Sequence, residues 1–256
     1  YDHHQYTNIR YPFPAAPPYV PKENPCGAYL YDFDYQQDEV APRAYLDFEG
    51  VASCFYVWLN GKFVGYSQVA HSTSEFDVTA LLQNGSNHLA VLVLKWCDGS
   101  YMEDQDMFRM NGIFRDVYLL CRPEQHIQDY FTTTGILPDR ADIRVRLRYR
   151  DLAVATRITI YDAAGTLIGT AAPAANPDDE AFPYCAVIPV PAPILWNAEQ
   201  PYLYTLVLET ACETITDRVG IREVHVADNQ IFVNGHSIKI HGVNRHESDP
   251  VTGYAI

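Results

Sequence analysis

Apolar and polar residues alternate with a period of two along most of this chain, which predicts β-strands. In residues 142–149 (DIRVRLRY) every second residue is apolar and arginine occupies most of the alternate positions. The stretches Arg43–Glu49 and Cys54–Leu59 have the same character, and Asn60-Gly61 follows the second of them as a hairpin turn signal. One short turn of helix is expected at residues 80–82. The pattern therefore predicts an all-β protein.

The spacing of these strands predicts two successive sandwiches. Short strands recur regularly up to about residue 121, which is typical of a jelly roll or a related sandwich. About seven strands then follow over roughly 100 residues, which fits an immunoglobulin-like sandwich. The first 27 residues are rich in proline and should form an extended strap. We predict domains at 1–121, 122–224 and 225–256, the last with a hairpin through Asn234-Gly235.

Composition excludes several classes of partner. The formal net charge is −14 and no basic patch stands out, which argues against nucleic acid. No run approaches the roughly 20 apolar residues that span a membrane. The start, Tyr1-Asp2-His3-His4, is unlike a signal peptide and lacks an initiator Met, so we expect a piece of a longer protein.

The six cysteines lack the spacing of a zinc site. Those at 54, 97, 121 and 185 lie in or beside apolar runs and are expected to be buried free thiols. Buried thiols indicate a reducing compartment, and we expect a cytoplasmic protein. A secreted domain held by disulfides is the alternative.

The strongest functional signal is the long acidic segment 96–116, WCDGSYMEDQDMFRMNGIFRD, which lies between two predicted strands. A connection of this length is usually functional. Its carboxylates can accept hydrogen bonds from hydroxyls or bind hard cations, and its aromatic rings can cover the apolar side of a sugar. The segment therefore favours a sugar or cation site, although an acidic loop is often only solvated.

This segment also carries a family resemblance. The run W-x-D-G-S-Y-x-E-D-Q-D-M-x-R-x-x-G-I-F-R-D-V resembles the large multidomain bacterial β-galactosidases of glycoside hydrolase family 2. Two later segments support it, W-x4-P-Y-L-Y at 196–204 and G-V-N-R-H-E at 242–247. The resemblance implies a jelly-roll sugar-binding domain, an immunoglobulin-like domain and then a (β/α)8 barrel that holds two catalytic glutamates. A barrel takes about 250 residues, so only its entry segment can be present and no catalytic residue is expected in this chain.

The resemblance implies three substrate-binding residues. Asp106 matches an aspartate that contacts galactose hydroxyls and ligates sodium, Asn8 matches an asparagine of the same pocket, and Arg245 matches an arginine near the pocket floor. Without the resemblance, Asp106 would be a loop carboxylate that accepts backbone N–H groups, and Asn8 a turn former. Arg245 would form a salt bridge at the barrel mouth. Sodium and magnesium are the implied cofactors of the parent enzyme, and we expect neither to be bound stably by this chain.

Other residues of the segment have structural roles in this interpretation. Arg109 and Arg115 should each pair with a nearby carboxylate and hold the shape of the loop. Trp58 alternates with Phe55 and Tyr56 in a strand and is expected in the core. Phe108 stands where many relatives have Trp, which leaves the role of its ring open.

The expected function is that of the non-catalytic N-terminal part of a retaining β-galactosidase, closing the galactose pocket and supporting the barrel. The expected partners are a β-galactoside, the rest of the enzyme and further copies in a homo-oligomer. The alternatives are a stand-alone carbohydrate-binding module, or a structural or complementation fragment without its own ligand. β-Glucuronidases and β-mannosidases share the layout, and the acidic residues 103–106 favour the galactosidase.

Overall fold

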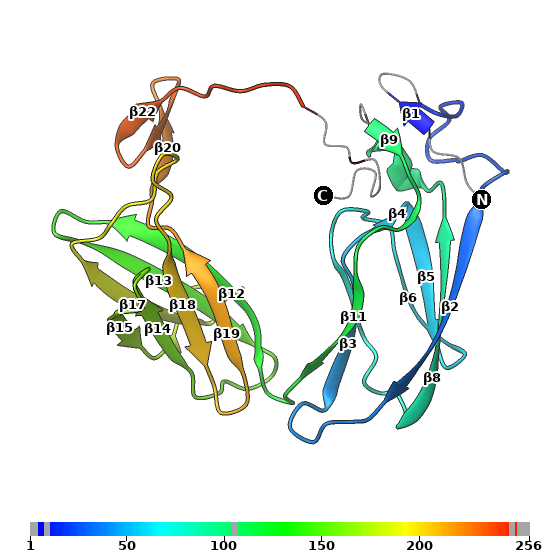
Figure 1. Ribbon diagram of the computed structural model, residues 1–256, viewed down its shortest axis with the longest axis horizontal. Helices are drawn as coiled ribbons and strands as arrows, with labels where there is room; N and C mark the ends of the chain where they lie inside the picture. The colour runs from blue at the N-terminus through cyan, green and yellow to red at the C-terminus, as the bar shows by residue number, and fades with distance from the viewer. Residues whose placement is uncertain (1–4, 8–10, 104–106, 246–248, 250–256) are drawn as a thin grey trace. The chain divides into compact units, whose positions relative to one another are not determined.

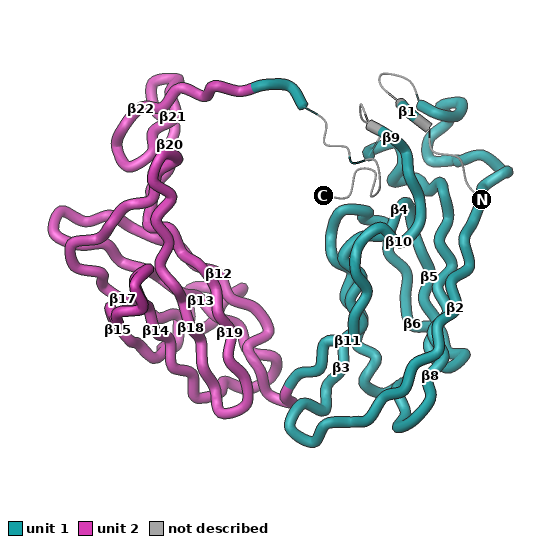
Figure 2. The backbone as a smooth tube through the Cα atoms, in the orientation of Figure 1, with its two compact units in different colours: residues 1–122, 243–256 teal, residues 123–242 magenta. Residues whose placement is uncertain are grey.

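The computed structural model describes residues 5–7, 11–103, 107–245 and 249. The chain divides into two compact units, residues 1–122 with 243–256 and residues 123–242 (Figure 2). Within the described ranges the regular elements are strands, apart from the 3-10 helix η1 at Asp98–Tyr101 (Figure 1). The all-β prediction is confirmed. The described part of the chain has no helix that is long and apolar enough to cross a membrane.

Unit 1 is a sandwich of two antiparallel sheets. The larger has the order β2-β8-β5-β6 and consists of Cys26–Tyr35, Gly85–Leu94, Cys54–Leu59 and Lys62–Ser67. The smaller has the order β11-β3-β7 and consists of Val117–Arg122, Arg43–Phe48 and Ser74–Asp77. At residues 80–82, where one short turn of helix was expected, the amides of Leu81 and Leu82 donate to the carbonyl of Val78 and form a single turn that is not extended into a helix.

Two short ribbons lie at one end of this sandwich. The strands β1 (Gln5–Thr7) and β9 (Met107–Arg109) pair with each other, as do β4 (Val51–Ala52) and β10 (Gly112–Ile113). The acidic segment is therefore not a plain loop, since it contains η1, β9 and β10. Short strands of two or three residues leave no periodic signal, which explains why the hydrophobic pattern did not predict them.

The core of unit 1 follows the period-two pattern. Phe55, Val57 and Leu59 of β5 point inward and are almost fully buried. Trp58 points to the outer face, where its ring lies 5.7 Å from that of Phe63 and is half-buried. The expectation that Trp58 is a core residue is therefore wrong, because alternation from the buried residues on either side of it leaves Trp58 on the other face.

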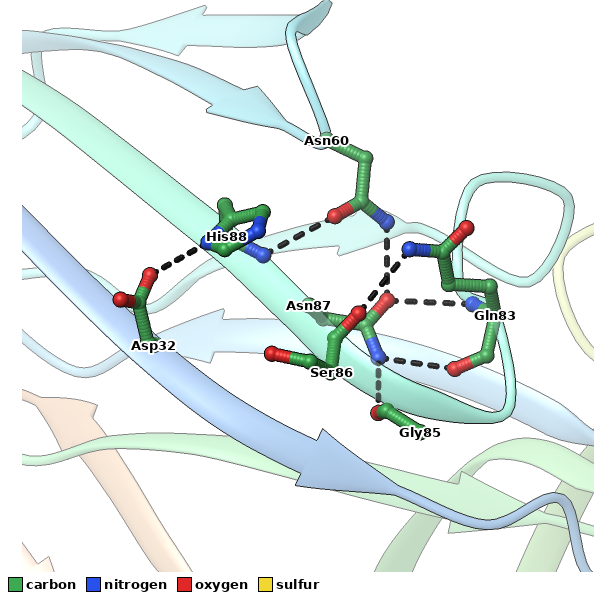
Figure 3. A network of polar contacts seen from close by, with 7 residues as sticks. All are labelled: Asp32, Asn60, Gln83, Gly85, Ser86, Asn87 and His88. Carbon is green, nitrogen blue, oxygen red and sulfur yellow. Dashed lines mark hydrogen bonds and ion pairs between the residues drawn. The ribbon is translucent and has the colours of Figure 1, made fainter.

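A network of side-chain amides closes one end of unit 1, and we call it the amide end (Figure 3). Asn87 is fully buried; its Nδ2 donates to the carbonyls of Gln83 and Gly85, and its Oδ1 accepts from the Gln83 amide and from Asn60 Nδ2. Asn60 adopts φ +52° in the β5–β6 turn, and its Oδ1 accepts from the amide of His88. Each amide thus satisfies backbone groups that the turns leave unpaired.

Unit 2 is a second sandwich, with its core between two four-stranded sheets. One has the order β12-β13-β17-β16 and consists of Ile127–Ile136, Arg140–Tyr149, Tyr184–Pro191 and Ala174–Ala175. The other has the order β15-β14-β18-β19 and consists of Leu167–Ala171, Arg157–Tyr161, Tyr204–Glu209 and Thr214–Val219. A small sheet follows, made of β20 (Val224–Ala227), β21 (Gln230–Val233) and β22 (His236–Ile238). Two successive sandwiches were predicted and are confirmed, although β12 and β19 were not foreseen.

Candidate functional site

The proline-rich strap crosses unit 1 at the end opposite the amide end, and aromatic residues hold it. Phe13 is buried with its ring 5.0 Å from Trp96 and 5.3 Å from Tyr101. The hydroxyl of Tyr101 donates to the carbonyl of Tyr19, and its backbone carbonyl accepts from the hydroxyl of Tyr11. The predicted strap is present over residues 11–25, where it makes a turn between Ala16 and Tyr19 and is not extended throughout, and η1 at the start of the acidic segment anchors it.

Two segments that are distant in sequence, β1 and β9, pair with each other at the same end of unit 1. In the antiparallel register of β1 and β9, Tyr6 faces Phe108 and Thr7 faces Met107 (Figure 1). The rings of Tyr6 and Phe108 lie edge to face, 5.7 Å apart, and both are exposed. The strap and the acidic segment therefore form one ribbon that presents aromatic surface.

A cavity of about 410 Å³ opens beside this ribbon, and we call this region the cavity end. Its walls come from the β4–β5 junction, the loop after β6, the end of β8 and the acidic segment. The lining residues are Ala52, Ser53, Ala70, His71, Lys95, Trp96, Met102, Glu103, Phe108, Arg109, Met110 and Asn111. Aromatic rings, amide groups and charged groups together are the surface that sugar recognition needs.

Two buried cations line the cavity. Lys95 and Arg109 are each at least nine-tenths buried, and Lys95 Nζ lies 5.1 Å from the centre of the Trp96 ring. The guanidinium of Arg109 donates to the carbonyl of Ser100, at 3.4 Å. Glu103 supplies the opposite charge and accepts the backbone amide of Ala70 through Oε1, at 3.1 Å. Ammonium and guanidinium groups are hydrogen-bond donors suited to hydroxyl and carboxylate oxygens.

Two further side chains shape the rim. Partial burial lowers the pKa of His71, and the charge of Arg115 lowers it further. His71 is therefore a neutral imidazole at pH 7, with one donor and one acceptor nitrogen. Arg115 was expected to pair with a carboxylate, but its described hydrogen bonds go to the carbonyls of Glu49 and His71. Carbonyl oxygens can hold a loop as a carboxylate would, because the guanidinium offers five donors.

A carboxyl group lies uncompensated near the same end. Asp47, close to the end of β3, is only 3% exposed, and its Oδ1 makes no hydrogen bond within the described part of the chain. Burial raises its pKa to about 6, and the charges of Glu75 and Glu49 contribute. Glu75 lies directly opposite Asp47 in the strand register. Ionising the buried carboxyl group of Asp47 therefore costs free energy, whereas the buried side chain at the amide end, Asn87, is neutral.

Of the three sequence-predicted binding residues, only Arg245 lies within the described part of the chain. Asn8 and Asp106 lie outside the described residues. In sequence Asn8 directly follows Thr7 and Asp106 directly precedes Met107, and Thr7 and Met107 are a registered pair. Arg245 is exposed and is not among the residues that line the cavity. No group of three or more His, Cys, Asp or Glu side chains that could hold a metal ion occurs in the described part of the chain.

Sequence reasoning missed the buried cations and the pairing of β1 with β9. The signal for Lys95 was available, because a lysine followed by Trp96 interrupts the apolar run of β8. The pairing had no comparable signal. The thiols also differ from expectation: Cys54 and Cys97 are buried, but Cys121 is exposed and Cys185 only half-buried. Cys121 is exposed although it shares its face of β11 with Val117 and Leu119, which pack against the core, so neither the apolar stretch nor the alternation decided its burial.

The described lining of the cavity contains a single carboxylate. A retaining glycosidase needs two carboxyl groups about 5 Å apart. Glu103 is the one carboxylate among the described lining residues, and it is engaged with the amide of Ala70. The described residues can bind and orient hydroxyl groups but do not form a hydrolytic pair.

Models of one family match almost the whole chain. The description "Glycosyl hydrolases family 2, sugar binding domain" applies to residues 1–123, "Glycosyl hydrolases family 2" to residues 125–222 and "Glycosyl hydrolases family 2, TIM barrel domain" to residues 224–256.

Curated relatives and solved structures agree with these matches. A beta-galactosidase of Actinobacillus pleuropneumoniae is 48% identical over all of this chain, which covers 24% of that protein. One of Staphylococcus xylosus is 44% identical, again over all of this chain and 25% of that protein. The chain thus spans about a quarter of the length of these relatives. A β-glucuronidase of Bifidobacterium dentium, solved with coumarin-3-O-glucuronide, has a TM-score of 0.78 at 22% identity over 90% of this chain and 45% of that one, which shows the shared fold.

Proposed function

This chain belongs to glycosyl hydrolase family 2, and we propose that it is the non-catalytic N-terminal part of a retaining β-galactosidase that hydrolyses terminal β-D-galactosides. Its role is to close one side of the galactose pocket and to support the barrel. The hydrolytic glutamates belong to the rest of the enzyme. The other expected partners are further copies of the enzyme in a homo-oligomer, and the expected compartment is the cytoplasm.

The observation that carries this proposal is the pairing of Thr7 with Met107 in the β1–β9 ribbon. In the sequence Asn8 directly follows Thr7, and Asp106 directly precedes Met107. The pairing of β1 with β9 therefore brings two segments that are far apart in the sequence together beside the cavity. Relatives at 44–48% identity that are beta-galactosidases support the choice of substrate.

Each residue has a chemical task in this proposal. Asp106 accepts hydrogen bonds from two galactose hydroxyls, while Asn8 can donate one and accept one. The exposed ring of Phe108 offers a face to the apolar side of the sugar. Arg245 acts nearer the pocket floor. These groups hold and orient the sugar, so that the reacting carbon faces the two carboxyl groups of the barrel.

The proposal includes sodium and magnesium as ions that the full-length enzyme binds. Asp106 is the residue of this chain that would hold sodium, since carboxylate oxygens suit hard cations. Sodium would supply positive charge for the sugar hydroxyls. Following the family resemblance, we expect the remaining ligands of either ion to lie on the rest of the enzyme.

The proposal is tested with the full-length enzyme and three chromogenic substrates, a β-galactoside, a β-glucuronide and a β-mannoside. We expect kcat/KM for the galactoside to exceed the other two by about 100-fold or more, because a site that binds hydroxyls rejects an analogue that leaves its polar groups unpaired. A preference for the glucuronide or the mannoside would contradict it.

A second arm uses the 256-residue chain alone, in which we expect no turnover. Turnover that disappears in Asp106→Ala would make the acidic segment itself a catalytic site and would overturn the division of roles. Galactose affinity of the isolated chain comparable to that of a lectin would instead favour a stand-alone carbohydrate-binding module.

A further inference from the structure

The outer face of the smaller sheet of unit 1 places two carboxylates directly opposite each other. Ala44, Leu46 and Phe48 of β3 belong to the core, so Asp47, which alternates with them, lies on the outer face of the sheet. Glu75 of β7 lies opposite Asp47 in the strand register. Like charges in such a pair destabilise a sheet, so this arrangement needs an explanation.

A second acidic pair extends the first. Glu49 continues the outer face of β3 by two residues, and its amide donates to the carbonyl of Asp116, which extends the ladder between β3 and β11. Glu49 and Asp116 are therefore opposite each other as well. Tyr118 of β11 lies opposite Asp47 and is 42% exposed. We call Asp47, Glu49, Glu75, Asp116 and Tyr118 the carboxylate face.

Asp47 lies at the centre of the carboxylate face and has an unmet need for a partner. It is on the middle strand of three and only 3% exposed, and its Oδ1 makes no hydrogen bond within the described part of the chain. A buried carboxylate is normally hydrogen-bonded or paired with a cation. The carboxylate face is therefore a surface on which a group from elsewhere would supply missing donors.

The arginines that share this sheet do not supply those donors. Arg43 and Arg122 face each other in the register of β3 and β11, but Arg43 lies four residues along β3 from Asp47, which is roughly 13 Å. The described hydrogen bonds of Arg115 go to backbone carbonyls. The ion pairs within the described ranges all involve carboxylates outside the carboxylate face.

The chemistry of the carboxylate face favours an arginine side chain over a metal ion. The described residues contain no group of three or more His, Cys, Asp or Glu side chains that could hold a metal ion. A guanidinium has five N–H donors in a planar fork, so it can bridge two carboxylates. It also packs well against an aromatic ring, and the exposed ring of Tyr118 is available for this beside Asp47.

Charge argues against a second copy of this chain as the source of the arginine. The formal net charge of the chain is −14, so two copies repel each other. Many of its arginines also pair with its own carboxylates, namely Arg140, Arg146, Arg148, Arg150 and Arg157. The chain spans about a quarter of the length of its curated relatives. The other three quarters of the protein are therefore the better source.

We propose that the carboxylate face is a docking surface for an arginine-bearing segment of the rest of the full-length enzyme. The guanidinium lies against the ring of Tyr118 and pairs with Glu75 and Asp47. Glu75 and Tyr118 flank Asp47 and are exposed, so their side chains can turn outward to admit it. The arginine offsets the repulsion between opposite carboxylates. This docking is independent of which sugar the enzyme takes.

Carboxyl labelling of the full-length enzyme tests whether the face is covered. The enzyme is treated near pH 7 with a water-soluble carbodiimide and glycine ethyl ester, and mass spectrometry of the digest gives the rate at each residue. Glu75 and Asp116 are exposed in this chain. We expect both to react about 10-fold or more slowly in the folded enzyme than after unfolding in urea, because a docked segment excludes the reagent.

Similar rates before and after unfolding would contradict the proposal. Slow labelling of Glu75 and Asp116 that becomes fast when the enzyme is diluted to single subunits would assign the face to a second copy, and would contradict it too. Neither measurement depends on a variant that folds poorly, and neither reads sugar turnover.

The charge of the partner is tested by Glu75→Gln in the full-length enzyme. We expect Tm to fall by about 1–3 °C, because the arginine loses a carboxylate. An unchanged or raised Tm would contradict the proposal, since without a cation the substitution only relieves the repulsion from Asp47. Glu39→Gln, at an exposed carboxylate outside the carboxylate face, is the matched control and should leave Tm within about 1 °C. In the isolated chain, which lacks the partner, Glu75→Gln should instead be stabilising.

Discussion

The two ends of unit 1 differ in the kind of polar side chain that they bury. Both bury polar side chains where loops connect the strands of one sandwich. At the amide end these are neutral amides, and Asn87 alone takes part in four hydrogen bonds with Asn60, Gln83 and Gly85 (Figure 3). At the cavity end they are cations, a carboxyl group and thiols, among them Lys95 and Cys97.

In this account the amide end contributes mainly to stability, and the cavity end contributes mainly to function. Neutral amides that match each other's donors and acceptors stabilise the turns and leave nothing for a ligand. Buried charges beside a cavity cost free energy, and a protein retains them where they do chemistry. We therefore expect substitutions at the amide end to change the free energy of unfolding, and substitutions of the sugar-facing residues at the cavity end to change sugar binding more than stability.

The largest stability effect is expected for Asn87→Ala. The change deprives the Gln83 amide and two backbone carbonyls of their partner inside the fold, at a cost of about 3–4 kcal/mol in the free energy of unfolding. Urea unfolding of the chain, followed by the fluorescence of Trp58 and Trp96, measures it. The matched control is Ser86→Ala, which should change the value by less than about 0.5 kcal/mol. Equal effects of both variants would break the comparison.

Phe13→Ala is expected to cost about 2–3 kcal/mol, because it removes a buried ring that contacts Trp96 and Tyr101. The loss falls on the strap that leads from β1, so KM for a β-galactoside should rise in the full-length enzyme. Steady-state kinetics and urea unfolding on the same preparation show both effects. Phe13→Leu, which keeps much of the volume, should lie between the two proteins. An unchanged KM would mean that the strap does not position the sugar.

Asp47→Asn should stabilise the chain in a way that depends on pH. The pKa of Asp47 is raised to about 6, so between pH 4 and pH 6 the folded chain holds a proton that the unfolded chain releases. The native chain therefore loses stability as pH rises through this window, by about 1–3 kcal/mol in total. Asparagine carries no such charge, so the gain should be complete above pH 6 and absent below pH 4.

Urea unfolding of both proteins at pH 4, 5, 6 and 7 checks this prediction. Glu75→Gln is the matched control, because it removes a neighbouring charge from Asp47 and should give a smaller gain of the same sign. A gain that does not vary with pH would show that the carboxyl of Asp47 is not the cause.

The smallest effect is expected for Gly61→Ala in the β5–β6 turn. Gly61 has φ +75°, and a methyl group there would meet no neighbouring atom within 4 Å. The cost is therefore that of backbone conformation alone, about 1 kcal/mol. Urea unfolding measures it, and the galactosidase activity of the full-length enzyme should be unchanged. A loss of activity would show that the amide end and the cavity end are coupled.

The sequence predicted the strands well because alternation records burial directly. Residues 142–149 and Cys54–Leu59 appear as strands within a few residues of the predicted limits. The outer position of Trp58 follows from the same alternation and was misjudged because residue type was given more weight than register. The β1–β9 ribbon was not predictable, since two strands of three residues carry no period and their pairing spans most of unit 1.

The candidate site was likewise predictable from the sequence only in part. Its chemistry was visible in the acidic segment, where Glu103 and Phe108 indeed line a cavity. The burial of Lys95 and Arg109 depends on long-range packing that a sequence does not state. The roles of Asn8, Asp106 and Arg245 stay predictions.

The most direct test of the account is kcat/KM for a chromogenic β-galactoside in the full-length enzyme carrying Asp106→Asn, measured beside Asn87→Ala at a temperature where both are folded. We expect Asp106→Asn to lower kcat/KM by about 100- to 1,000-fold with the midpoint of urea unfolding unchanged, since it removes a charged acceptor of sugar hydroxyls. We expect Asn87→Ala to shift the midpoint and leave kcat/KM within about twofold. If Asp106→Asn retained wild-type kcat/KM, or if the two variants lost activity equally, the cavity end would not be the sugar-binding end of this unit.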